Sequence, residues 1–174
     1  TNYSIYAQDE WLFDPQWVLT TGVRYDNYSD FGDTINPRLA LVWASSQDTT
    51  AKLLYGRAFR APSISELFAT SNPVTLGNAN LTPETIDTYE LAFNHKLSPK
   101  LSYSSNIFYY QIDDFIVFEF NPVTFAKQAQ NTGQLEGHGF EHEMTYYATD
   151  ELKLIGHYAY QTSKDKVYGG TLGE

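Results

Sequence analysis

The sequence predicts an all-β fold, an antiparallel up-and-down sheet of about eight strands, on three observations. Polar and apolar side chains alternate along repeated runs, which is the two-residue period of a strand with one apolar face. The connections between these runs alternate between short and long. Finally, the chain contains no run of about 20 apolar residues, the length that a membrane-spanning helix needs.

The alternation is clearest in the run that begins near Trp17. One face carries Trp17, Leu19, Thr21, Val23 and Tyr25, and the other carries Gln16, Thr20, Arg24 and Asp26. The same pattern recurs in residues 38–44, 88–94, 101–109 and 153–161. An Arg or Lys at the lipid midplane costs about 2–4 kcal/mol. The polar face is therefore expected to line a lumen and the apolar face to contact lipid, as in a transmembrane β-barrel.

Composition agrees with a membrane barrel. Hydrophobic residues make up 42% and aromatic residues 16% of the chain, yet the mean hydropathy is −0.40. A barrel shows lipid only every second residue, so a running average hides its hydrophobicity. The net charge of −10 and the scattered basic residues argue against a nucleic-acid partner. The absence of Cys does not distinguish a protein that crosses the periplasm from a cytosolic one. The lack of an initiator Met and of a signal peptide at Thr1 favours an excised fragment.

The lengths of the connections predict which end of the sheet faces the periplasm. Short turns are expected at residues 14–15, 45–48, 98–99 and 149–150, and longer connections at 29–35, 61–83, 115–131 and beyond Ser163. Outer-membrane barrels have short periplasmic turns and long external loops, so the first set is assigned to the periplasm. Trp11, Phe13 and Trp17 straddle the first short turn, as in an interfacial aromatic girdle. A soluble β-sandwich is the alternative, but it gives no reason for the alternating connections.

Several segments carry a family resemblance. Residues 56–68 (GRAFRAPSISELF), 78–84 (NANLTPE) and 89–91 (YEL), with shorter matches at 6–11, 22–26, 36–39 and 139–143, stand in order and at compatible spacing. Together they resemble the β-barrel domain of TonB-dependent outer-membrane receptors, the siderophore and vitamin B12 receptor family. The resemblance covers most of the chain.

The resemblance implies a function and a larger barrel. Such transporters have about 22 strands and a plugged lumen, so residues 1–174 are expected to be part of the barrel, with the plug domain and the remaining strands absent. The implied protein lies in the outer membrane of a Gram-negative bacterium, contacts its lipid and imports a scarce nutrient, powered by TonB through the plug. A ferric siderophore is the first choice of ligand, followed by cobalamin or haem.

Two expectations concern the eight strands taken alone. An open sheet leaves two edges with unpaired backbone groups, so the isolated fragment should pair through them. The alternative from another class is a small closed eight-stranded barrel with a structural or adhesive role.

Candidate ligand-binding residues lie in the external loops or the lumen. We expect Arg57, Arg60, Phe68, Asn78, Asn80, Phe118, Phe120 and Lys127 to contribute. Arg60 and Pro62 also suit a strand end, because Pro has no amide to donate. Arg57 shares the apolar face with Leu53, Tyr55 and Phe59, so either it snorkels toward the rim or a bulge shifts the register.

No motif indicates catalysis. His138, Glu141 and His142 spell an H-x-x-E-H pattern, which on a helix is a zinc-hydrolase signature. Nearby glycines and the family resemblance favour a strand, where Glu141 points away from both histidines. We therefore expect no enzyme activity, no catalytic metal and no cofactor.

Overall fold

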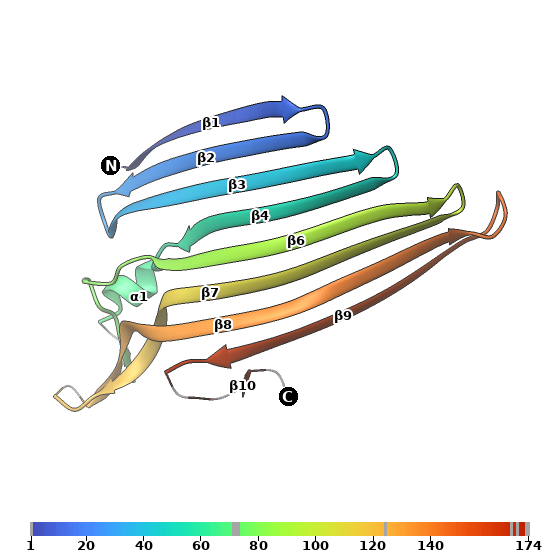
Figure 1. The fold of residues 1–174 in the computed structure, drawn as a ribbon. Helices are drawn as coiled ribbons and strands as arrows, with labels where there is room; N and C mark the ends of the chain where they lie inside the picture. Colours follow the sequence, from blue (N-terminus) through green and yellow to red (C-terminus); the bar gives the residue numbers. More distant parts are fainter. Residues whose placement is uncertain (1, 71–73, 124, 168, 170, 173–174) are drawn as a thin grey trace.

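The computed structural model describes residues 2–70, 74–123, 125–167, 169 and 171–172. Within them, eight long antiparallel strands form one sheet (Figure 1). The long strands are β1 (Asn2–Asp14), β2 (Trp17–Tyr28), β3 (Gly32–Ser46), β4 (Thr49–Arg60), β6 (Glu84–Ser98), β7 (Leu101–Asn121), β8 (Ala126–Tyr147) and β9 (Lys153–Asp165). The short elements are α1 (Ile64–Phe68), β5 (Thr75–Leu76) and β10 (Thr171–Leu172). The predicted fold class is confirmed.

The sheet is open. Each long strand pairs with the next in chain order, and β5 pairs with β8 in parallel. β1 is exposed along its whole length, and it lies at the opposite side of the sheet from β9 (Figure 1). Over the described residues β1 and β9 do not pair, so the alternative of a small closed barrel is wrong for this structure.

The four short turns lie where the sequence predicts them and gather at one end of the sheet (Figure 1). We call this the turn end, and the opposite end, with α1 and the tip of the β7–β8 hairpin, the loop end. The expected long connection at 29–35 is wrong, because β3 already begins at Gly32, which pairs with Tyr28. Gly32 adopts φ +96°, a conformation that glycine reaches without a steric penalty because it has no Cβ, and this permits the tight turn.

The expected external loop at 115–131 is also wrong, because most of it is an extension of the β7–β8 hairpin. Phe118 pairs with Ala129 and Phe120 with Lys127. The ladder is interrupted between Ile112 and Phe115, where Asp114 adopts a left-handed φ of +57°. Asp tolerates this conformation better than most residues. The bulge bends the hairpin without ending it.

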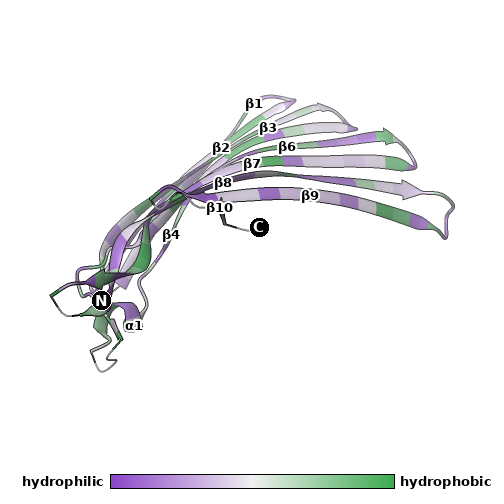
Figure 2. Ribbon diagram, turned by 90° about the horizontal axis from the view of Figure 1, so that it is seen from below, coloured by the Kyte–Doolittle hydropathy of each residue, from purple (hydrophilic) through white to green (hydrophobic). Residues whose placement is uncertain are grey.

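Side chains divide into two faces that match the predicted alternation. One cross-strand row joins Leu53, Leu91, Ile107, Phe140 and Tyr160. Leu53 and Leu91 are about half exposed although they are apolar. The opposite face carries polar residues such as Lys52, Glu90 and Glu141, and hydropathy alternates along the strands of the curved sheet (Figure 2). We call the first the outer face and the second the inner face.

The buried apolar side chains gather at the loop end. Leu67, Leu81, Ile116 and Ala129 form one small cluster. A single-layer sheet cannot bury its own faces, so the outer face needs a cover that the described part of the chain does not supply. None of the described helices is long and apolar enough to cross a membrane.

Candidate ligand-facing rim

Arg60 fixes the loop 61–83 to the end of the sheet. Its Nε donates to Glu84 Oε2 at 2.6 Å on β6, and its Nη1 and Nη2 donate to the two carboxylate oxygens of Glu66 on α1, each at 3.1 Å. Glu84 is buried and accepts a further bond from the Ile116 amide on β7 at 2.8 Å. One guanidinium thus joins β4, β6 and α1, and Glu84 extends the connection to β7.

The first turn of α1 is capped reciprocally. The Glu66 amide donates to Ser63 Oγ at 3.2 Å, and the Ser63 amide donates to Glu66 Oε2 at 2.7 Å. This capping box satisfies two amides that the helix leaves unpaired. Burial opposes ionisation of Glu66, but the hydrogen bonds from Arg60 and Ser63 outweigh it and hold the pKa of this carboxyl below its usual value.

A close backbone approach holds the return segment against α1. The Gly77 amide donates to the Ala69 carbonyl at 2.8 Å, and the Asn78 amide donates to the Glu66 carbonyl at 2.8 Å. A Cβ on Gly77 would lie 2.7 Å from the Ala69 nitrogen and 2.8 Å from the Leu67 carbonyl, closer than real Cβ contacts allow. Only glycine fits this position without moving the backbone.

Amide side chains line an open cavity of about 580 Å³ between this loop and β8. Its lining is uncharged: Asn78, Asn80, Thr82, Gln128, Gln130, Asn131 and Thr132. We call it the amide pocket. Asn78 Nδ2 donates to the Ala129 carbonyl at 3.0 Å, and Asn131 exchanges two bonds with the backbone of Thr82, at 2.9 and 3.0 Å. These bonds tie the pocket's two walls together.

The structure brings two of the predicted residues into the amide pocket and leaves others outside it. Asn78 and Asn80 line it, and the Asn80 side chain makes no described hydrogen bond. Phe68 at the end of α1 and Phe120 on the hairpin are more than half exposed, and Phe118 is 42% exposed. Lys127 is also exposed and pairs with Phe120 across the hairpin. The loop end thus presents exposed aromatic rings, but none of these three rings lines the pocket.

Arg57 lies on the outer face. It is paired with Asp87 across the strands, with Nη2 at 2.7 Å from Asp87 Oδ2, and Tyr55 donates to the same carboxylate at 2.6 Å. The β4–β6 register is continuous here, so no bulge turns Arg57 inward. Its row lies one step toward the loop end from an aromatic row of Tyr55, Tyr89 and Tyr109. This position matches a cation that snorkels past an interfacial girdle.

Gln128, Thr82 and Thr132 were missed by sequence reasoning. The parallel pairing of Leu76 with Gln128 places this amide in the pocket, and a two-residue strand gives no readable periodicity. The repeated Gln and Asn residues of 128–134 were a usable signal, because neutral amides suit a ligand-facing wall as well as a loop.

His138, Glu141 and His142 lie on strand β8, as predicted. The two histidines share the outer face with Tyr109 and Phe140, while Glu141 pairs with Asn106 on the inner face. Among the described residues, no group of three or more His, Asp or Glu side chains could hold a metal ion.

A curved sheet with an apolar outer face, a polar inner face and a structured rim describes a membrane-barrel wall. A family model for the β-barrel of TonB-dependent receptor-like proteins matches residues 1–174. The chain belongs to the TonB-dependent receptor β-barrel family. The family consists of transport receptors of the Gram-negative outer membrane, so the predicted family and location are confirmed.

Relatives and solved structures agree with this membership. The iron-regulated outer membrane virulence protein of Vibrio cholerae is 26% identical and covers 95% of this chain. The vitamin B12 transporter BtuB of the same species is 31% identical over 67% of it. The siderophore receptor PirA from Pseudomonas aeruginosa matches 93% of the chain with a TM-score of 0.79 and 25% identity. The chain spans 28%, 18% and 32% of the length of these three proteins, respectively.

Proposed function

We propose that residues 1–174 form part of the barrel wall of a receptor that imports a scarce nutrient, and that further strands and a plug complete it in the intact protein. The observation that carries this proposal is an apolar outer face in a sheet whose edges, over the described residues, are unpaired along β1 and along β9 apart from its two-residue pairing with β10. Strand edges inside a membrane must be paired, because lipid offers no hydrogen bonds. Neighbouring strands of a larger barrel supply that pairing.

The ligand that the rim supports best is a ferric siderophore. Neutral amides in the amide pocket offer donors and acceptors to an oxygen-rich chelate without favouring one net charge. The printed names of an iron-regulated relative and of a siderophore receptor agree with this choice. Import is powered by TonB acting on the plug, as the family resemblance implies.

A corrinoid is the second candidate. The vitamin B12 transporter is the more identical of the two relatives named above, and the exposed rings of Phe68, Phe118 and Phe120 suit the face of a flat macrocycle. Both ligands would meet the same rim, so binding has to be measured for each.

The test uses the intact receptor in isolated outer membranes with radioactive iron loaded on a panel of siderophores, and with labelled cobalamin. We expect saturable binding of one of them. The Asn80→Ala, Gln130→Ala double variant should weaken that binding by about five- to tenfold, as expected for one or two lost hydrogen bonds. Asn94→Ala is the matched control, because Asn94 lies on the inner face toward the turn end. Absence of binding by every probe would contradict the proposal.

A further inference from the structure

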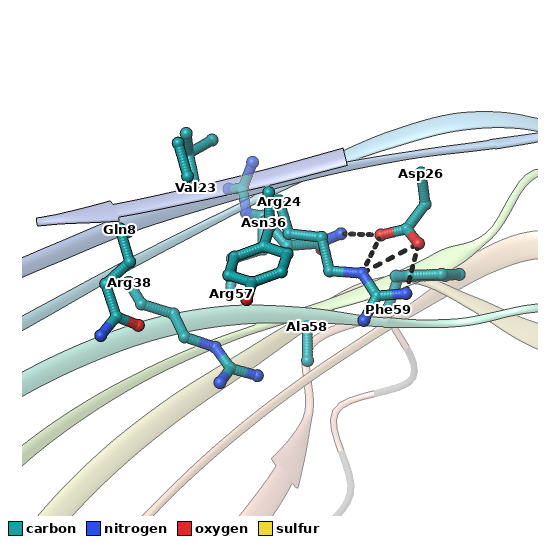
Figure 3. Close-up of a pocket in the computed structure, with 12 residues that line it drawn as sticks. Gln8, Val23, Arg24, Asp26, Asn36, Arg38, Arg57, Ala58 and Phe59 are labelled. Carbon is teal, nitrogen blue, oxygen red and sulfur yellow. Dashed lines mark hydrogen bonds and ion pairs between the residues drawn. The ribbon is translucent and has the colours of Figure 1, made fainter. Parts of the chain in front are cut away.

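Arg38 on the inner face makes no hydrogen bond or ion pair with any residue that the structure describes. It is exposed and lines two adjoining cavities of the inner wall. Figure 3 shows its side chain extended away from Asp26, beside Gln8, with no dashed line to its guanidinium. An unpaired Arg in a wetted wall can simply be solvated, so its surroundings decide what it does.

The register places Arg38 in a slot between two glycines. A single cross-strand row runs from Gln8 through Gly22, Arg38 and Gly56 to Thr88. A Cβ on Gly56 would meet nothing within 4 Å, and one on Gly22 would make only ordinary contacts. Each glycine therefore leaves room for a Cβ beside Arg38, and neither glycine is required by the packing of the sheet.

A second unsatisfied group lines the same cavity. Asn36, two residues before Arg38 on the same face, is 94% buried, and its Oδ1 has no hydrogen-bond partner. Its amide nitrogen donates to Thr34 Oγ1 at 3.1 Å and to Asp26 Oδ2 at 3.4 Å, which fixes the orientation, because a flipped amide would set two acceptors against each other. An unsatisfied buried acceptor is costly, so the intact protein is expected to supply a donor.

The neighbouring charge is already neutralised. Arg24 is bound to Asp26 through Nε and Nη2, at 2.9 and 2.7 Å, and Asp26 is almost fully buried (Figure 3). Among the described residues, the wall around Arg38 thus presents a cation and a buried acceptor without partners, on residues whose Cα atoms lie about 7 Å apart along the strand. A partner that satisfies both needs an anionic acceptor and an N–H donor.

We propose that Arg38, Asn36 and the slot beside Gly56 bind an Asp or Glu residue of a polypeptide segment that fills the lumen. Its carboxylate pairs with the planar guanidinium of Arg38, and an N–H of its backbone donates to Asn36 Oδ1. This inference rests on the proposed function, since large transport barrels of this kind have a plugged lumen. A carboxylate is the fitting group because Arg presents a fork of donors, whereas Gln8 beside it is neutral.

The experiment measures how well the lumen is shielded in the intact receptor in outer membranes. The described chain contains no Cys, so a single Ser104→Cys on the inner face reports access, in a receptor without other cysteines, through its rate of labelling by a membrane-impermeant maleimide. Arg38→Gln removes the cation, and Gly56→Val narrows the slot at a position where an added Cβ meets nothing within 4 Å. Two variants are the controls: Lys52→Gln, at another inner-face cation without a described ion pair, and Gly156→Val, at an open position on the outer face of β9.

We expect both slot variants to raise the labelling rate about tenfold, as the loss of one charge-assisted contact predicts, and both controls to leave it unchanged. If the slot variants are labelled at the same low rate as a wild type with a shielded cysteine, the inference is overturned and the proposed function stays intact. A fully accessible cysteine in the wild type would instead show that no segment fills the lumen, which contradicts the proposed function itself. If Arg38→Gln lowers only the uptake of a carboxylate-bearing solute and leaves labelling unchanged, the partner is the solute and the inference is wrong.

Discussion

At the scale of single residues, the position of a side chain in the two-residue period decides whether it lies on the outer or the inner face. Arg57 and Arg38 lie on adjacent strands, yet Arg57 is on the outer face bound to Asp87 and Arg38 is on the inner face without a described partner. Parity, which needs only local information, predicts the inner face for Arg38. For Arg57 it leaves a choice between snorkelling from the apolar face and a bulge, and the continuous β4–β6 register decides for the outer face. The sequence does not predict Asp87 as the partner of Arg57, because that depends on the register between strands separated by a long loop.

A matched pair of substitutions tests this assignment. Leu91→Arg places a cation on the outer face and should destabilise the barrel by about 2–4 kcal/mol if the residue lies near the lipid midplane. Ala92→Arg puts the same cation on the inner face and should cost much less. The measurement is the free energy of unfolding of the intact receptor refolded into lipid vesicles. Equal losses for the two variants would contradict the assignment of the faces.

At the scale of elements, the long strands and short turns are predictable and the loop-end structure is not. Helix α1 has five residues and β5 has two, so neither can form without tertiary contacts. They are held by Arg60, Glu66 and Glu84, whose meeting depends on the folded sheet. The sequence predicts a loop over residues 115–131, whereas pairing between β7 and β8 extends the hairpin through most of this range, a long-range contact that local sequence does not reveal.

Acid should loosen α1 from the sheet. The folded-state pKa of Glu66 is lowered, so its ion pair and capping bonds stabilise the rim fully above the ordinary carboxyl pKa, about 4.3. This stabilisation is lost as pH falls through the lower, folded-state value. A spin label at Phe68→Cys in the intact receptor should gain mobility below about pH 4. In the Glu66→Gln background that mobility should already be raised at neutral pH and change less with acid, and an unchanged acid response would contradict the role of Glu66.

At the scale of the whole molecule, the described residues form a single-layer sheet that is open along β1 and along most of β9, with a cluster of buried apolar residues at its loop end. Its apolar outer face and polar inner face are stable together only between lipid and a wetted or filled lumen. The alternation that reveals this arrangement is visible in the sequence. The identity of the lumen partner and of the ligand is not, because both depend on contacts outside these strands.

A barrel wall requires that the outer face contacts hydrocarbon, and spin labels along β6 measure this contact. Single cysteines at Thr88, Tyr89, Glu90, Leu91, Ala92 and Phe93 of the intact receptor in lipid vesicles would carry the label, and its collisions with oxygen and with a water-soluble nickel chelate would be measured. We predict high oxygen accessibility at Tyr89, Leu91 and Phe93 and low values at Thr88, Glu90 and Ala92. Oxygen accessibility that does not alternate, or that alternates with the opposite phase, would contradict the account.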